Sequence, residues 1–117
     1  MRKIILSILL FLFCIGCTKE SAYKKIDGKE ATRLIKKGAI ILDVRSTIEY
    51  EQGHIKGAIQ IPYYEVDTLT YSKNSKIIVY CRTGSRSKKA ADLLLELGYQ
   101  HIYDLGSIDN YKEAIEK

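Results

Sequence analysis

The chain has 117 residues, of which 46% are hydrophobic and 28% charged, and its formal net charge is +5. This length suits one small domain with a modest core and leaves no room for a second domain. Arg2 and Lys3 supply part of the positive charge, and the remaining excess is too mild to indicate binding to nucleic acid.

The N-terminus has the pattern of an export signal. Arg2 and Lys3 precede an apolar run from Ile4 to Ile15, and polar sequence begins at Thr18. This order of segments is typical of a secretory signal, and the run is shorter than the ~20 residues that a membrane span needs. We therefore expect a signal peptide, a polar tether and one folded domain over residues 1–16, 17–22 and 23–117.

The end of the apolar run, Cys14-Ile15-Gly16-Cys17, resembles a bacterial lipobox. In that motif a small residue precedes the cysteine that becomes the lipidated first residue, and Cys14 stands where a leucine is usual. The resemblance implies cleavage before Cys17 and a lipid anchor on it. The protein would then lie in the cell envelope on the extracytoplasmic side, such as the periplasm. An uncleaved anchor and plain secretion are the alternatives.

The three cysteines are expected to have different roles. Cys14 would leave with the signal peptide and Cys17 would carry lipid, so Cys81 would be the only free thiol of the mature chain. A single free thiol in an exported protein indicates reactivity. A disulfide between Cys17 and Cys81 is the alternative, although it would block the segment around Cys81. Two histidines far apart in the sequence and one thiol predict no metal site.

Apolar runs alternate with segments of helical spacing after residue 22. The strands are expected at residues 23–26, 39–43, 58–61, 77–80 and 101–103. The helical segments are expected at residues 28–37, 47–50, 64–69, 88–97 and 108–116. Asp27 and Ser46 are the expected N-caps of the first two helices. Strands that alternate with helices predict an α/β fold with a parallel sheet covered on both faces.

The strand at residues 77–80 leads into a loop that begins at Cys81 and ends at Arg86. Backbone N–H groups of Thr83 to Ser87 should point inward at the start of the next helix, which forms a cradle for an anion. A helix N-terminus and neighbouring cations favour the thiolate form of a cysteine. The cations near this loop are Arg82, Arg86, Lys88 and Lys89. The alternatives are an inert core thiol at Cys81 and, for the two lysines, a solvated helix face.

Cys81-Arg82-Thr83-Gly84-Ser85-Arg86 resembles the active-site loop of rhodanese-type sulfurtransferases, in which the cysteine carries a persulfide. A second segment, LDVRSTIEYEQGHIKGAIQIP from Leu42 to Pro62, is similar to the N-terminal half of that domain. The resemblance weakens at residues 105–111, which replace a more usual Leu-x-Gly-Gly and a nearby Trp. It implies a rhodanese-like fold with a central five-stranded parallel sheet and the loop at the carboxyl ends of the strands.

The resemblance also implies a reaction. Cys81 would take sulfane sulfur from thiosulfate or a similar small anionic donor and pass it to cyanide or a thiol, without a cofactor or metal. The substrate-binding residues would be Arg82, Thr83, Gly84, Ser85, Arg86 and Ser87. A non-catalytic sulfur carrier and a redox-sensing module are the alternatives.

A phosphatase is a further alternative, because dual-specificity phosphatases have a similar loop with five residues between Cys and Arg. Here four residues separate Cys81 from Arg86, and Ser87 occupies the position of the phosphatase arginine. The shorter spacing favours sulfur transfer.

Three further residues are expected to support the loop rather than react. Asp43 and Arg45 lie two residues apart at the end of a strand, hence on the same side, which predicts an ion pair that braces the loop. His54 lies in a segment that looks like scaffold in the family. We therefore expect a hydrogen-bonded structural histidine there, with a general base as the alternative.

Overall fold

The computed structural model describes residues 22–117, so the expected signal peptide and Cys17 lie outside the described residues. The strands are β1 Lys24–Lys25, β2 Ile40–Asp43, β3 His54–Ile55, β4 Ile59–Gln60, β5 Lys76–Cys81, β6 His101–Ser107 and β7 Ile115–Glu116. The α-helices are α2 Gly28–Lys36, α3 Thr47–Gln52 and α4 Ser85–Glu96, and the 3-10 helices are η1 Tyr63–Thr68 and η2 Ile108–Asn110. None of the helices within residues 22–117 has the length and apolar character needed to span a membrane.

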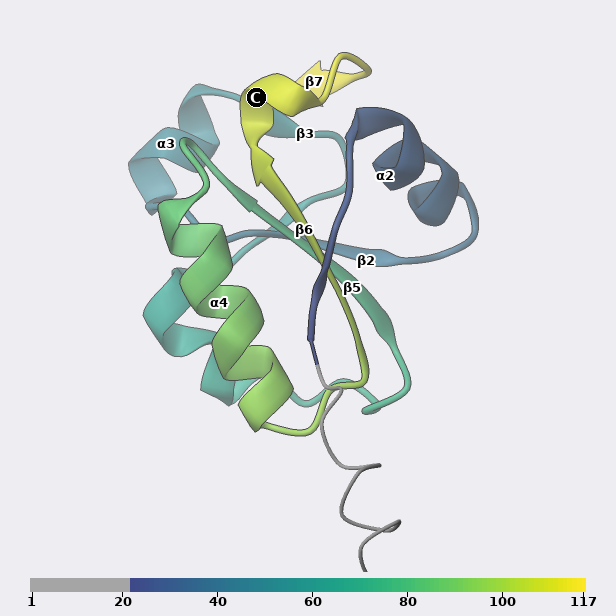
Figure 1. The fold of residues 1–117 in the computed structure, drawn as a ribbon. Coiled ribbons are helices and arrows are strands. Elements are labelled where there is room, and N and C mark those ends of the chain that lie inside the picture. The colour runs from purple at the N-terminus through teal and green to yellow at the C-terminus, as the bar shows by residue number, and fades with distance from the viewer. Residues whose placement is uncertain (1–21) are drawn as a thin grey trace, which may run out of the picture.

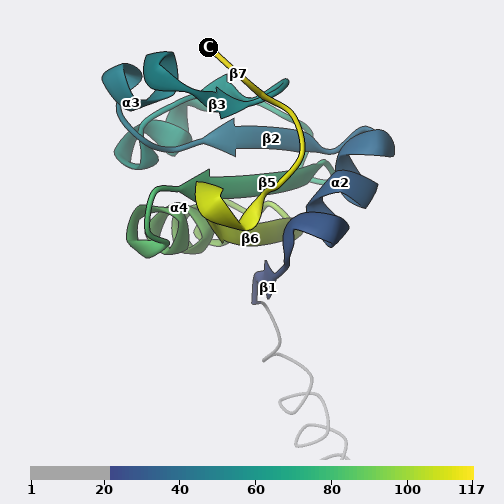
Figure 2. The ribbon, with the colours of Figure 1, turned by 90° about the horizontal axis from the view of Figure 1, so that it is seen from above.

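Five strands form one sheet in the order β1-β6-β5-β2-β4, and every neighbouring pair is parallel. The predicted five-stranded parallel sheet is therefore confirmed. β2, β5 and β6 lie side by side across its middle (Figure 2). β5 runs to the loop from which α4 turns back along the sheet (Figure 1). This loop follows the carboxyl end of a central strand, where open α/β sheets bind their ligands.

The alternation of side chains along β5 builds a core on each face of the sheet. Ile77, Val79 and Cys81 belong to the core beneath α4 and η1. Ile78 and Tyr80 belong to the opposite core, which α2 covers. All five of these side chains are completely buried, so Cys81 is held in place by the packing of the sheet.

Side-chain caps fix the two helices that precede the loop. Asp27 caps α2 by accepting a hydrogen bond from the backbone N–H of Glu30 at 2.9 Å. Ser46 caps α3 in a capping box with Glu49, in which each side chain binds the other residue's backbone N–H. α4 begins at Ser85 rather than at residue 88, because the end of the Cys81 loop forms its first turn.

The prediction of a helix over residues 108–116 was wrong. The chain makes only the short η2 turn, and β7 then pairs antiparallel with β3 in a second, two-stranded sheet. The apolar residues 108, 111 and 115 have helical spacing, but Asn110 donates a side-chain hydrogen bond to the Leu105 carbonyl oxygen at 2.8 Å. The Asn110 carbonyl also packs against Gly28 so closely that a Cβ there would lie 2.3 Å from its oxygen. These contacts direct the C-terminal segment across the molecule toward β3 (Figure 2).

Candidate active site

Cys81 is the last residue of β5, and its side chain is completely buried. Its Sγ accepts hydrogen bonds from the backbone N–H groups of Gly84 at 3.0 Å and Ser87 at 3.3 Å. Both donors belong to the start of α4, where the helix dipole favours negative charge. The burial agrees with the alternative of a core thiol, but the two N–H groups directed at sulfur give the site the character of an anion cradle.

Gly84 gives the loop its shape. Its φ is +103°, a left-handed conformation that favours glycine, and the nearest atom to an added Cβ would be the Gly106 Cα at 3.9 Å. The requirement for glycine is therefore conformational rather than steric. Ser107 Oγ donates to the Arg82 carbonyl oxygen at 2.7 Å, which fastens the loop to the end of β6.

The loop side chains differ in exposure. Arg82, Thr83 and Ser85 are exposed, Gly84 and Arg86 are half-buried, and Ser87 is buried with its Oγ donating to the Gly84 carbonyl oxygen at 3.2 Å. The six residues predicted to bind substrate are therefore contiguous around the thiol, but they do not all face solvent. Lys88 and Lys89 are exposed on α4.

Arg86, at the end of the loop, forms an ion pair with a carboxylate from another helix. Its Nη1 and Nη2 donate to Oε1 and Oε2 of Glu49 at 2.8 and 3.0 Å, which is a bidentate ion pair between α4 and α3. Hydrogen bonding to Arg86 lowers the pKa of Glu49 to about 2, and hydrogen bonding to Glu49 raises the pKa of Arg86. This partner of Arg86 was not predicted from the sequence. Ser46 was the expected N-cap of this helix, but nothing in the sequence placed Glu49 beside a residue 37 positions later.

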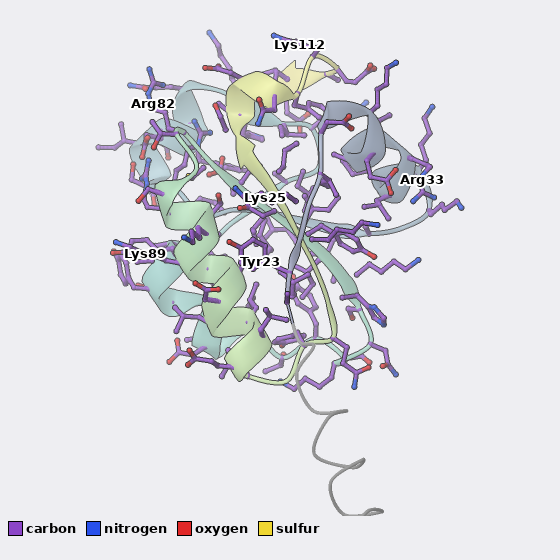
Figure 3. The ribbon with its side chains drawn as sticks, viewed as in Figure 1. Tyr23, Lys25, Arg33, Arg82, Lys89 and Lys112 are labelled. Carbon is purple, nitrogen blue, oxygen red and sulfur yellow. The ribbon has the colours of Figure 1, made fainter. Side chains whose placement is uncertain are left out.

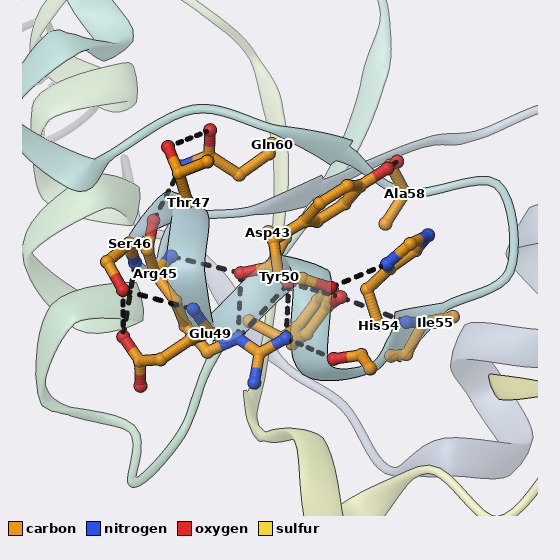
Figure 4. A network of polar contacts seen from close by, with 12 residues as sticks. Asp43, Arg45, Ser46, Thr47, Glu49, Tyr50, His54, Ile55, Ala58 and Gln60 are labelled. Carbon is orange, nitrogen blue, oxygen red and sulfur yellow. Dashed lines mark hydrogen bonds and ion pairs between the residues drawn. The ribbon is translucent and has the colours of Figure 1, made fainter. Parts of the chain in front are cut away.

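A buried polar network centred on Asp43 and Arg45 is shown in Figure 4. It includes Tyr80, which belongs to the core on the face of the sheet opposite to Cys81. Asp43 accepts hydrogen bonds from Arg45 Nη2 at 2.6 Å and from the Tyr80 hydroxyl at 2.7 Å. Arg45 Nη2 also donates to the Gly53 carbonyl oxygen at 2.7 Å, and the Tyr80 hydroxyl accepts from the Ile55 N–H at 3.1 Å. Hydrogen bonding to Asp43 raises the pKa of Arg45, and burial raises the pKa of Tyr80.

The predicted Asp43–Arg45 ion pair is thus present, but it connects β2 to β5, β3 and the end of α3 rather than to the loop side chains. Tyr80 and Gly53 are members of this network that the sequence did not reveal. Tyr80 directly precedes Cys81, so the network fixes the backbone from which the thiol projects.

His54 has structural contacts. Its Nδ1 donates to the Tyr50 carbonyl oxygen at 2.8 Å, and its ring stacks on the Tyr50 ring with centroids 3.6 Å apart. Its Nε2 lies 3.6 Å from Glu116 Oε2 on β7. These partners connect α3, β3 and β7, so the contacts of His54 are structural.

Hollows lie beside the loop, and two of them border its arginines. One of about 430 Å³ lies between α3, Arg82 and the C-terminal segment, and it includes Lys112. Arg82 and Lys112 project at the same end of the molecule (Figure 3). The other, of about 340 Å³, has Arg86 at its edge and is lined mainly by residues 44–48 and 62–64. Over residues 22–117, no group of three or more His, Cys, Asp or Glu side chains could hold a metal ion.

The parallel sheet, the cysteine at the end of its central strand and the two N–H groups on sulfur define a rhodanese-type site. The family model for the rhodanese-like domain matches residues 27–114, and the chain belongs to that family. It is 39% identical over 71 residues to the thiosulfate sulfurtransferase PspE of Escherichia coli K12, a match that covers 57% of this chain and 68% of PspE.

Other relatives carry the domain within longer chains. A tRNA uridine(34) hydroxylase of Hamiltonella defensa is 35% identical over 102 residues, which cover 79% of this chain but only 29% of the hydroxylase. Among solved structures, a rhodanese with anions from E. coli superposes with a TM-score of 0.64 at 34% identity. That match covers 68% of this chain and 99% of the solved one.

Proposed function

We propose that this protein transfers sulfane sulfur from thiosulfate or a related anionic donor to cyanide or a thiol acceptor, with Cys81 as the sulfur carrier. The observation that carries the proposal is the position of Cys81 Sγ, which accepts hydrogen bonds from two backbone N–H groups at the start of α4. A thiolate and a persulfide anion are both stabilised by such donors. The similarity to PspE supports the same reaction class.

The reaction is a double displacement. The Cys81 thiolate attacks the outer sulfur of thiosulfate, the S–S bond breaks, and its electron pair leaves with sulfite. The resulting Cys81 persulfide then gives its outer sulfur to cyanide or to a thiolate, and the Cys81 thiolate returns. Because Cys81 is completely buried, the loop must open to admit the donor.

The proposal is tested by thiocyanate formation from thiosulfate and cyanide while both concentrations are varied. We expect the parallel-line kinetics of a double displacement, loss of turnover in Cys81→Ser and normal turnover in Cys17→Ser, the matched cysteine control. If Cys81→Ser releases thiocyanate at the original rate, Cys81 is not the carrier.

A second candidate is a sulfur carrier or redox-sensing module without turnover, and the complete burial of Cys81 favours it because burial restricts access. The two candidates differ in stoichiometry. A carrier releases at most one thiocyanate per Cys81, whereas an enzyme releases many.

Aryl phosphates should not be hydrolysed above background, since the loop has one residue fewer than that of the similar phosphatases.

We also propose that the domain is anchored in the cell envelope through lipid on Cys17, on the extracytoplasmic side. The support is the sequence pattern of Arg2, Lys3, the apolar run and Gly16-Cys17. A second acyl chain would make the attachment stable, because each buried CH₂ contributes about 0.8 kcal/mol.

A further inference from the structure

Glu49 supplies the carboxylate that binds Arg86 at the Cys81 loop. The two side chains come from α3 and α4 and are only partly exposed, 24% for Glu49 and 31% for Arg86. Their two parallel hydrogen bonds, at 2.8 and 3.0 Å, fix the plane of the guanidinium as well as its distance. Arg86 is therefore held in one orientation before any substrate binds.

The Glu49 carboxylate is itself held in place. Its Oε1 accepts hydrogen bonds from the Ser46 backbone N–H at 3.1 Å and from Ser46 Oγ at 2.9 Å (Figure 4). Because the pKa of Glu49 is about 2, the carboxylate is charged throughout the neutral range. The capping box of α3 thus also acts as a fixed support for Arg86.

Arg86 directly precedes Ser87, whose backbone N–H donates to Cys81 Sγ at 3.3 Å, so the arginine belongs to the turn that surrounds the sulfur. The charge of Cys81 also contributes to the raised pKa of Arg86. The Glu49 pair occupies Nη1 and Nη2, so the Nε–H and one N–H on each Nη remain as donors. Glu49 also compensates the charge of Arg86. Arg82, by contrast, is exposed and takes part in no ion pair within the described part of the chain.

We propose that Glu49 is a positioning residue for sulfur transfer, which orients Arg86 beside Cys81 and, by compensating its charge, limits the affinity of the site for dianionic donors. This role rests on the proposed sulfurtransferase function. It predicts that two kinetic constants fall for different reasons. Without the carboxylate, the site gains net positive charge and KM for thiosulfate falls, while Arg86 loses its orientation and kcat falls.

The test compares Glu49→Gln with Glu51→Gln, which removes the same charge from an exposed position on the same helix. We expect Glu49→Gln to lower kcat about tenfold and to lower KM for thiosulfate about twofold. Glu51→Gln should leave kcat within twofold. Equal kinetic constants in the two variants, or a higher kcat in Glu49→Gln, would overturn the proposal.

A second variant keeps the test valid if Glu49→Gln does not fold. Ser46→Ala removes one hydrogen bond from the Glu49 carboxylate, together with the cap bond that Ser46 Oγ accepts from the Glu49 N–H, and changes no charge. It should lower kcat two- to threefold with KM unchanged, because the loss of one hydrogen bond loosens the carboxylate that orients Arg86. An unchanged kcat in a folded Ser46→Ala protein would contradict the positioning role.

A chemical readout separates this proposal from the proposed function. Iodoacetate is an anion and iodoacetamide is neutral, so the ratio of their rates of alkylation at Cys81 reports the local charge without any sulfur transfer. The ratio should rise in Glu49→Gln and stay near the wild-type value in Glu51→Gln. If thiosulfate does not react but this ratio rises, the sulfurtransferase function fails and the charge role of Glu49 stands. An unchanged ratio contradicts that role.

Discussion

Replacing Tyr80 with phenylalanine should weaken the buried network that supports the backbone next to Cys81. The hydroxyl donates to Asp43 Oδ2 at 2.7 Å and accepts from the Ile55 N–H at 3.1 Å, and the side chain is completely buried. Loss of a hydrogen bond to a charged partner costs about 1.5–3 kcal/mol, and a buried N–H left without a partner costs about 1–3 kcal/mol. Tyr80→Phe should therefore lower the free energy of unfolding by about 3–5 kcal/mol.

The assay is urea unfolding followed by circular dichroism, with Tyr64→Phe as the matched control. Tyr64 is 65% exposed, so the same chemical change there should cost less than about 0.5 kcal/mol. Thiocyanate formation should also slow in Tyr80→Phe, because the neighbouring Cys81 loses part of its backbone support. A loss of stability equal to that of Tyr64→Phe would refute the reasoning that this hydroxyl joins the strands.

Three further predictions concern the loop, the ion pair and the N-terminus. Gly84→Ala should cost about 1–3 kcal/mol of stability and slow sulfur transfer, because φ is +103° and its N–H binds Cys81 Sγ. Gly38→Ala, with φ of +96° and open space around it, should cost a similar amount of stability but leave the rate unchanged. Because its pKa is lowered in the fold, Glu49 should stabilise the protein above pH about 4.5. As pH falls toward about 2, unfolding experiments should show that the free energy of unfolding drops by about 1–2 kcal/mol. This drop should be absent in Glu49→Gln. Cys17→Ser should move the protein from the membrane to the soluble fraction or leave the uncleaved precursor, and wild-type protein without lipid mass at Cys17 would contradict the anchor.

The main sheet was predictable because its signals are local. Its central strands β2 and β5 are short apolar runs between turn residues, and the caps at Asp27 and Ser46 lie directly before their helices. The Cys81 loop was predictable for the same reason, since a strand, a glycine and a helical segment follow one another within a few residues. The Asp43–Arg45 pair needed only the two-residue period of a strand.

The features that the sequence did not reveal depend on contacts between distant segments. β7 exists only because it pairs with β3, and the alternative helix over residues 108–116 had a plausible local pattern. The partner of Arg86 comes from a different helix, and the Tyr80 hydroxyl is 37 residues from the Asp43 carboxylate that it binds. Complete burial of Cys81 likewise depends on residues of α4 and η1 that pack in the same core.

Intact-mass spectrometry of the purified protein after treatment with thiosulfate tests the role of Cys81 most directly. We predict a gain of one sulfur atom, about 32 Da, that cyanide removes and that Cys81→Ser does not show. Cys17→Ser should retain the gain, because that cysteine takes no part in the transfer. A wild-type protein whose mass is unchanged by thiosulfate, or a Cys81→Ser protein that still gains sulfur, would contradict the persulfide mechanism.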